Sequence, residues 1–292
     1  MIRGSIVALV TPFNESGGVD FDALKRLVDY HITEGTHAIV AVGTTGESAT
    51  LTHQEDAAVI RAAVEYSAGR IPVIAGAGSN STSEACQLTE AATKAGANLI
   101  LSVAPYYNKP PQAGLLAHFR AVADSTDLPI ILYNVPGRTV TDIADDTTLE
   151  LAEVTNIAGI KDATGDLARA QYLLENRPEG FAIYSGDDPT AMELCLLGGD
   201  GDISVTANVA PRLMAKMIEA ALENRREDAE KMNQKLIGLH SNLFIEPNPM
   251  PTKWALAKMG FMRAECRLPL VALTEKGAIA VADACAQAGI QL

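Results

Sequence analysis

Short apolar runs recur along the chain, separated by longer stretches that carry a helical pattern. Eight of these runs are apolar at most positions instead of at every second one. Such runs are typical of parallel strands that are covered on both faces. The predicted strands are Ser5–Val10, Ala38–Val42, Ile71–Ala75, Leu99–Val103, Pro129–Tyr133, Ile157–Lys161, Phe181–Ser185 and Asp202–Val205.

The stretches between the predicted strands have the features of amphipathic helices. Residues 21–28 place apolar side chains at positions i, i+3, i+6 and i+7, which lie on one face of a helix. Two helix starts show the S/T-x-x-E pattern of a capping box: Thr52 with Glu55, and Ser81 with Glu84. The chain therefore alternates strand and helix over most of its length.

This alternation favours a closed barrel. Successive predicted strands begin roughly 20 to 33 residues apart, close to the spacing in a (β/α)8 barrel of about 250 residues. The main alternative is a doubly wound open sheet, which usually carries a glycine-rich first turn, whereas residues 10–14 contain no G-x-G-x-x-G. We predict the α/β class: a (β/α)8 TIM barrel over residues 1–224, with a C-terminal helical extension over residues 225–292.

The extension contains three helical patterns that a closed barrel cannot include. We expect them to pack outside the barrel or at a subunit interface. The charged run 223–228 before them is predicted to be a solvated helix or connection, and the proline-rich stretch 246–251 separates the first two. The predicted helices are Arg226–Leu243, Pro251–Met259 and Glu275–Ala288.

Composition and charge narrow the choice of partners. The chain is 48% hydrophobic and 20% charged, as in ordinary globular proteins, and its net charge is −13. That charge disfavours nucleic acids and anionic membranes, which need a basic face. The four cysteines show no CxxC pair, so we expect free thiols in a reducing compartment. With no signal peptide and no membrane-span-length apolar stretch, the predicted location is the cytoplasm.

Lys161 is the first candidate for chemistry, because it ends the sixth predicted strand. Barrel enzymes build their active sites at the C-terminal ends of the strands. Burial beside apolar walls favours the neutral form of an amine, which is a nucleophile for carbonyl groups. From this strand alone, a structural ion pair with Asp162 or Asp166 is the alternative.

Other strand ends supply partners for such an amine. Tyr133 relays protons if its hydroxyl lies near the lysine, and is otherwise a core or rim aromatic. The Gly43–Ser48 turn exposes backbone N–H groups and the hydroxyls of Thr44 and Thr45. It lacks a P-loop lysine, so a carboxylate is the expected ligand unless the turn is an ordinary βα connection. Arg138 offers a bidentate fork for a second carboxylate, or forms a surface salt bridge.

The sequence gives little support to a metal site or to the active site of a serine hydrolase. The five histidines show no HExxH or paired spacing, so no metal site is predicted. A serine hydrolase is disfavoured because the chain has no G-x-S-x-G elbow. A lysine, a tyrosine and a carboxylate cradle without a metal point to Schiff-base carbon–carbon chemistry on a 2-oxo acid, with no external cofactor.

Several motifs along the chain resemble those of a known family. The chain resembles the 4-hydroxy-tetrahydrodipicolinate synthase (dihydrodipicolinate synthase) family, within the N-acetylneuraminate lyase superfamily. The resemblance runs from residue 4 to the C-terminal helices. The motifs are GTTGES at Gly43–Ser48, YNVPGRT at Tyr133–Thr139, GIKDATGD at Gly159–Asp166, SGDD at Ser185–Asp188 and ISVTANV at Ile203–Val209.

The resemblance implies an activity and an assembly. Members condense pyruvate with (S)-aspartate 4-semialdehyde to form 4-hydroxy-tetrahydrodipicolinate, on the diaminopimelate route to lysine. It further implies a homotetramer arranged as a dimer of dimers. Carried over residue by residue, it makes Lys161 the Schiff-base lysine. Tyr133, Thr44 and Tyr107 become the proton relay, with Tyr107 reaching in from the neighbouring subunit.

The same resemblance implies how the two substrates are held. Thr45 offers its backbone amide and hydroxyl to the pyruvate carboxylate. Arg138 receives the carboxylate of aspartate semialdehyde. Gly186 and the carbonyl of Ile203 complete the wall of the pocket.

A lysine effector site, distinct from Lys161, is also implied at a subunit interface. One position departs from the family pattern: Asp56 stands where many lysine-sensitive bacterial members carry histidine. The added carboxylate should attract a dicationic ligand, provided that Asp56 is not already paired with a neighbour such as Arg61. The matching effector residues are Ser48, Ala49, His53, Asn80, Glu84 and Tyr106.

Two rival functions share part of this pattern. An N-acetylneuraminate or 2-oxo-3-deoxy-sugar lyase has the lysine and the tyrosine, but does not need Arg138 in this loop and usually shows GSTGE instead of GTTGES. A non-catalytic barrel that senses a 2-oxo acid or lysine belongs to a different class. The presence of every relay residue argues against the sensor.

Overall fold

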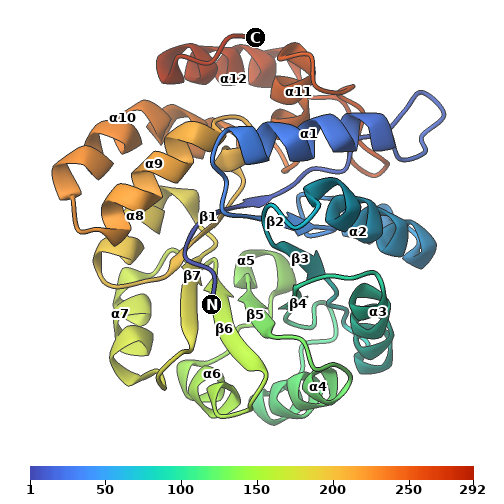
Figure 1. The fold of residues 1–292 in the computed structure, drawn as a ribbon, viewed down its shortest axis with the longest axis vertical. Helices are drawn as coiled ribbons and strands as arrows, with labels where there is room; N and C mark the ends of the chain where they lie inside the picture. The colour runs from blue at the N-terminus through green and yellow to red at the C-terminus, as the bar shows by residue number, and fades with distance from the viewer.

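The computed structural model describes residues 1–292 as a closed ring of eight parallel strands (Figure 1). Strand order around the ring follows the chain, and β1 pairs with both β2 and β8. The predicted barrel is confirmed, and each strand boundary lies within two residues of its predicted position. The strands are β1 (Gly4–Ala8), β2 (Ala38–Ala41), β3 (Val73–Gly76), β4 (Leu99–Val103), β5 (Ile130–Asn134), β6 (Ile157–Asp162), β7 (Ala182–Ser185) and β8 (Gly201–Ser204).

Helices surround the ring and then continue past it. None of them combines the length and the apolarity required to cross a bilayer. They are α1 (Phe21–Thr33), α2 (His53–Ser67), α3 (Thr82–Lys94), α4 (Gln112–Asp124), α5 (Pro136–Thr139), α6 (Asp145–Ala152), α7 (Leu167–Asn176), α8 (Asp188–Leu196), α9 (Pro211–Leu222), α10 (Arg226–Asn242), α11 (Met250–Lys258) and α12 (Glu275–Ala288), with 3₁₀ turns η1 (Ser48–Thr50) and η2 (Thr206–Asn208).

The two predicted capping boxes have different outcomes. Thr52 forms the complete box at the start of α2. At α3, Ser81 accepts a hydrogen bond from the Glu84 amide, but the Glu84 carboxylate does not return to Ser81. It accepts from the Ser79 hydroxyl and bonds His53 Nε2 at 3.0 Å. That half of the prediction is wrong, because the β3–α3 loop and α2 bring stronger partners to the carboxylate.

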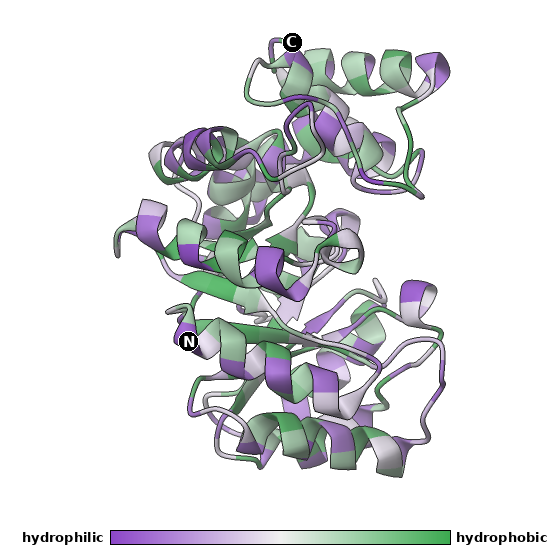
Figure 2. Cartoon of the chain, turned by 90° about the vertical axis from the view of Figure 1, so that its right-hand side faces the viewer, coloured by the Kyte–Doolittle hydropathy of each residue, from purple (hydrophilic) through white to green (hydrophobic).

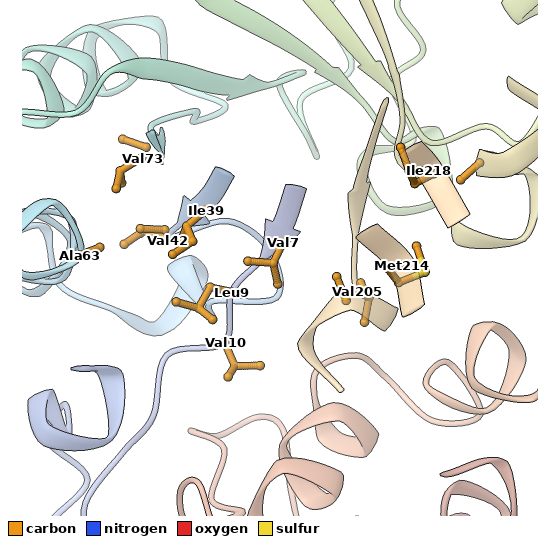
Figure 3. Packing of buried hydrophobic residues seen from close by; sticks show 14 of the residues in the cluster. Val7, Leu9, Val10, Ile39, Val42, Ala63, Val73, Val205, Met214 and Ile218 are labelled. Atoms are coloured by element: carbon orange, nitrogen blue, oxygen red, sulfur yellow. The ribbon is translucent and has the colours of Figure 1, made fainter. Parts of the chain in front are cut away.

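Apolar side chains form two clusters, one inside the barrel and one between the strands and the helices. The inner cluster has 13 buried residues and the outer one has 63, so most of the core joins sheet to helix. Figure 3 shows part of the outer cluster, with Val7 of β1 near Ile39 of β2, and Met214 and Ile218 of α9 in the same region. In Figure 2 the strands are mainly green, whereas the helices mix green with purple.

The C-terminal helices pack outside the barrel, as predicted, and lie together on one side of it (orange to red in Figure 1). Helix α10 packs against α8 and α9, and α11 and α12 pack against each other. Leu236 and Leu239 of α10 belong to the same apolar cluster as the outer face of the barrel. The charged run before α10 is solvated, since Arg225 pairs with Glu223 and Asp228 at the surface.

Candidate active site

A cavity of about 280 Å³ opens at the C-terminal ends of the strands. The turn after β2, the ends of β5, β6 and β7, and the last turn of α10 contribute to its wall. A cavity of this size suits a small ligand that is held by a few polar groups. Among the predicted site residues it brings together Thr44, Thr45, Tyr133, Arg138, Lys161 and Gly186.

Lys161 is buried at the end of β6, with 5% of its surface exposed. The sheet register places it between Tyr133 of β5 and Tyr184 of β7. Its Nζ lies 4.3 Å from the centroid of the Tyr133 ring. Tyr133 and the amine are therefore neighbours on adjacent strands.

The two acidic neighbours of Lys161 in sequence do not pair with it. Asp162 accepts hydrogen bonds from Asn134 Nδ2 at 3.1 Å and from the hydroxyl of Thr164. Asp166 caps α7 by accepting from two of its first amides. Lys161 itself has no ion pair, so the structural ion-pair alternative is wrong and the amine remains available for a ligand.

Gly186 explains why the lysine chain fits where it does. A Cβ at this position would lie 2.7 Å from Lys161 Cε and 2.8 Å from Ala163 Cβ. Both separations are shorter than packed carbon atoms tolerate. Glycine at this position therefore leaves the space through which the Lys161 side chain reaches the cavity.

The turn after β2 forms the opposite part of the wall. Thr45 is buried, and its hydroxyl accepts a hydrogen bond from Asn248 Nδ2 at 2.9 Å. Asn248 also lines the cavity. Sequence reasoning missed Asn248, because the proline-rich stretch around it was interpreted only as a separator between helices. The available signal was a lone amide side chain within that stretch.

Three predicted residues take different positions around the cavity. Arg138, on α5, is exposed at the cavity wall, and its side chain makes no ion pair or hydrogen bond, so it does not form a surface salt bridge. The side chain of Ile203 lies in the barrel interior instead of at the cavity, where Val205 is found. Tyr107 is 88% exposed with a positive φ of 73° and does not line the cavity of its own chain.

The loop after β8 is held by a buried acid that sequence reasoning did not single out. Asp188 accepts from the Ser204 hydroxyl and from the amides of Val205 at 3.1 Å and Thr206 at 2.9 Å. The Thr206 hydroxyl in turn bonds His240 Nδ1 at 2.9 Å. This network fixes the wall beside Val205. No three His, Cys, Asp or Glu side chains in the structure are arranged to hold a metal ion.

A second cavity, of about 520 Å³, lies next to the first and contains most of the predicted effector residues. Thr44, Tyr133 and Arg138 line both cavities. Asn80 is not on its wall, and its carbonyl accepts from Asn108 Nδ2 at 2.9 Å. The effector residues that do line it are Ser48, Ala49, His53, Glu84 and Tyr106.

Asp56 also lines the second cavity, where it is 6% exposed. It is not paired with Arg61 or any other cation, and its Oδ1 has no hydrogen-bond partner. Burial raises the pKa of Asp56 to about 7, with His53 opposing the shift and Glu84 adding to it. With a pKa near 7, the Asp56 side chain is only partly ionised near neutral pH.

Comparison with known proteins shows the family of this chain. The model of the dihydrodipicolinate synthetase family matches residues 1–288. The chain belongs to this family. It is 57% identical over 291 residues to the 4-hydroxy-tetrahydrodipicolinate synthase of Azoarcus sp. (strain BH72), covering 100% of both chains. It is also 57% identical over 290 residues to the synthase of Pseudomonas putida (strain W619), covering 99% of each.

Solved structures of dihydrodipicolinate synthases share the fold over nearly the whole chain. The chloride-inhibited enzyme from Acinetobacter baumannii, complexed with pyruvate, superposes with a TM-score of 0.98 at 51% identity, covering 99% of this chain and 100% of that one. The enzyme from Cyanidioschyzon merolae with lysine bound has a TM-score of 0.95 at 40% identity, covering 99% of this chain and 98% of that one.

Proposed function

We propose that this chain condenses pyruvate with (S)-aspartate 4-semialdehyde to form 4-hydroxy-tetrahydrodipicolinate, through a Schiff base on Lys161. The observation that carries the proposal is the buried, unpaired Lys161 beside Tyr133 at the C-terminal mouth of the barrel. Membership of the dihydrodipicolinate synthetase family and the relatives' names support the same reaction. The unpaired Arg138 favours a second carboxylate-bearing substrate over a sugar.

The covalent steps follow from amine and carbonyl chemistry. The neutral amine of Lys161 adds to the ketone of pyruvate, and a proton delivered by the hydroxyl relay to the resulting carbinolamine lets water leave, which gives a protonated imine. The positive nitrogen acidifies the neighbouring methyl group, so that loss of a proton gives an enamine. The enamine carbon attacks the aldehyde of aspartate semialdehyde. The amine of that substrate then displaces Lys161 from the imine carbon, which closes the heterocycle and frees the enzyme.

Protons move through three hydroxyl groups in this proposal. Tyr133, whose ring centroid lies 4.3 Å from the Lys161 amine, exchanges protons with it and with the bound intermediates. Thr44 links Tyr133 to Tyr107 of the partner subunit. The exposure of Tyr107 in a single chain supports a role in a neighbouring site.

Two carboxylates are held by different elements. The amide and hydroxyl of Thr45 bind the carboxylate of pyruvate, and the Arg138 fork binds that of the semialdehyde. Gly186 leaves room for the Lys161 side chain, and the main-chain carbonyl of Ile203 completes the wall of the pocket at the end of β8. The role of Ile203 is limited to its backbone, because its side chain lies inside the barrel.

The assembly and its regulation are part of the same proposal. We infer a cytoplasmic homotetramer, a dimer of dimers, in which Tyr107 crosses between subunits. Free lysine, the product of the pathway, binds the second cavity and inhibits the enzyme. The lysine-bound relative from Cyanidioschyzon merolae and the residues shared by the two cavities support this regulation.

Reductive trapping tests the central claim. The protein is treated with pyruvate and sodium borohydride, digested, and mapped by mass spectrometry, and turnover is assayed separately with aspartate semialdehyde. We expect one adduct, on Lys161, and none in Lys161→Ala, whose turnover falls by orders of magnitude. An adduct on another lysine, above all on the buried Lys253, contradicts the assignment.

A further inference from the structure

The turn that carries Thr44 and Thr45 is tied to the C-terminal extension by a buried ion pair. Glu47 belongs to this turn (Gly43–Ser48), and its side chain is 2% exposed. Lys253, in the middle of α11, is 0% exposed, and its Nζ contacts Glu47 Oε1. More than 200 residues of sequence separate the two partners.

Other polar groups contact both members of this ion pair. Lys253 Nζ donates to the Glu265 carbonyl at 2.9 Å and lies 4.0 Å from the centroid of the Phe13 ring. Glu47 Oε2 accepts from the Arg267 amide at 2.9 Å. Burial lowers the pKa of Lys253, while the Glu47 carboxylate opposes that shift. Both side chains are buried, so the pair connects the extension to the barrel away from the solvent.

A buried ion pair of this kind adds little to the free energy of unfolding. Taking two charges out of water costs about as much as their attraction returns, and well-packed apolar residues often serve as well. A buried pair does fix geometry, because each partner must keep its place. The backbone supports this reading: Glu47 has a φ of 57°, which a non-glycine residue keeps only where its surroundings enforce it.

A second connection acts on the same turn. Asn248, just before α11, donates from Nδ2 to the Thr45 hydroxyl at 2.9 Å. The extension therefore contacts the turn at Thr45 and at Glu47, on either side of Gly46. Thr44 and Thr45 lie on the cavity wall with Lys161, so a shift of the turn displaces them relative to the amine.

We propose that Glu47, Lys253 and Asn248 are positioning residues, which hold the Gly43–Ser48 turn at the distance from Lys161 that pyruvate requires. In this proposal the helical extension positions part of the active site in addition to packing outside the barrel. This inference rests on the proposed function for its kinetic consequences, but the geometry of the turn is measurable without catalysis.

The test is the double variant Glu47→Gln/Lys253→Met, which removes both charges together and so leaves no unpaired charge in the interior. The matched control is Glu193→Gln/Arg226→Met, because that exposed ion pair also joins the extension to the barrel, between α8 and α10. Displacement of a positioning group by about 1 Å costs on the order of 100-fold in rate. We expect a loss of about 10- to 100-fold in kcat/KM for pyruvate in the test variant only, carried mainly by KM, with KM for the semialdehyde unchanged.

Hydrogen exchange gives a readout that does not depend on turnover. Peptides covering residues 43–48 should exchange faster in the test variant than in the parent and the control, while β6 keeps its protection. If the test variant melts like the parent and keeps both its pyruvate KM and its exchange rates, the positioning role is wrong. Equal losses for both substrates, with exchange raised throughout the chain, show a merely structural pair and also overturn it.

Asn248→Ala decides the matter if the double variant does not fold. It removes the other connection to the turn without touching a buried charge. Faster exchange at 43–48 with a raised pyruvate KM supports positioning, and parental values of both refute it. A parent protein that fails to condense the two substrates refutes the proposed function instead, and the exchange comparison still decides whether the extension holds the turn.

Discussion

Gly186 controls the approach of the Lys161 side chain to the cavity. A Cβ at residue 186 would lie less than 3 Å from Lys161 Cε and from Ala163 Cβ. The absence of a side chain therefore leaves the space that these two groups need. Overpacking of this kind forces side chains from their preferred rotamers and costs about 1–3 kcal/mol. Here the group that must move is the one that carries the chemistry.

Gly186→Ala should therefore lower turnover far more than stability. We expect a decrease on the order of 100-fold in kcat, because the amine is displaced, measured by steady-state kinetics beside the melting temperature. Gly137→Ala is the control, since a Cβ there meets nothing within 4 Å. Normal kcat in Gly186→Ala, with a normal trapping rate, would show that the lysine has another route to the cavity.

Arg138 has a free guanidinium at the wall of the cavity, so its contribution to selectivity is directly measurable. Arg138→Ala should weaken use of aspartate semialdehyde while pyruvate trapping on Lys161 stays intact. Loss of a bidentate charge-assisted pair of about 2–3 kcal/mol corresponds to roughly 30- to 150-fold in kcat/KM. Parallel loss of pyruvate trapping contradicts the division of the two carboxylates between Arg138 and Thr45.

At the scale of elements, α2 places one unpaired acid in the second cavity. The pKa of Asp56 is raised to about 7 by burial, so the side chain is neutral below that pH and anionic above it. Only the anion attracts a ligand that carries two ammonium groups. The strength of lysine inhibition should consequently rise with pH.

The expected change is about ten-fold. At pH 6 roughly one Asp56 in ten is ionised, so half-maximal inhibition should need about ten-fold more lysine at pH 6 than at pH 8. Lysine titrations of the steady-state rate at both values measure it. Asp56→Asn should remove most of the difference, and whatever persists is assigned to His53 and Glu84, which face the same cavity. A pH-independent response in the parent excludes Asp56 as the sensor.

The barrel strands were predictable because each is a nearly continuous apolar run with helices on either side. The candidate site followed from the same pattern, since Lys161, Tyr133 and Thr44 occupy strand ends that any barrel brings together. The second capping box failed because the Glu84 carboxylate is bound by Ser79 of the preceding loop and by His53 at the start of α2. The contact between Lys253 and Glu47 was beyond prediction for the same reason, as no local pattern reports a pairing between elements so far apart.

At the scale of the whole molecule, the proposed role of Tyr107 in a neighbouring site predicts that a single chain is an incomplete catalyst. The ring is exposed in the middle of the loop between β4 and α4 and does not line the cavity of its own chain. Tyr106, beside it, lines the second cavity instead. If Tyr107 serves the neighbouring site, two differently disabled chains can restore one working site in a mixed dimer.

Subunit mixing tests this arrangement. Lys161→Ala and Tyr107→Phe chains, each inactive or nearly so, should regain activity when they are unfolded and refolded together. Hybrid dimers with one complete site should show up to about half of the parental rate per dimer. Native mass spectrometry confirms that hybrids form, and hybrids without activity place Tyr107 in the site of its own subunit.

Closure of the barrel has a consequence for synthesis of the chain. Strand β1 lies between β2 and β8, so its second edge stays open until residues 201–204 have been made. At about 5–20 residues per second, that edge waits roughly 10 to 40 s for its partner. An unpaired strand edge invites association with other chains. Lys253 and Asn248 are translated later still, so a nascent chain can complete its barrel before these residues can contact the Gly43–Ser48 turn.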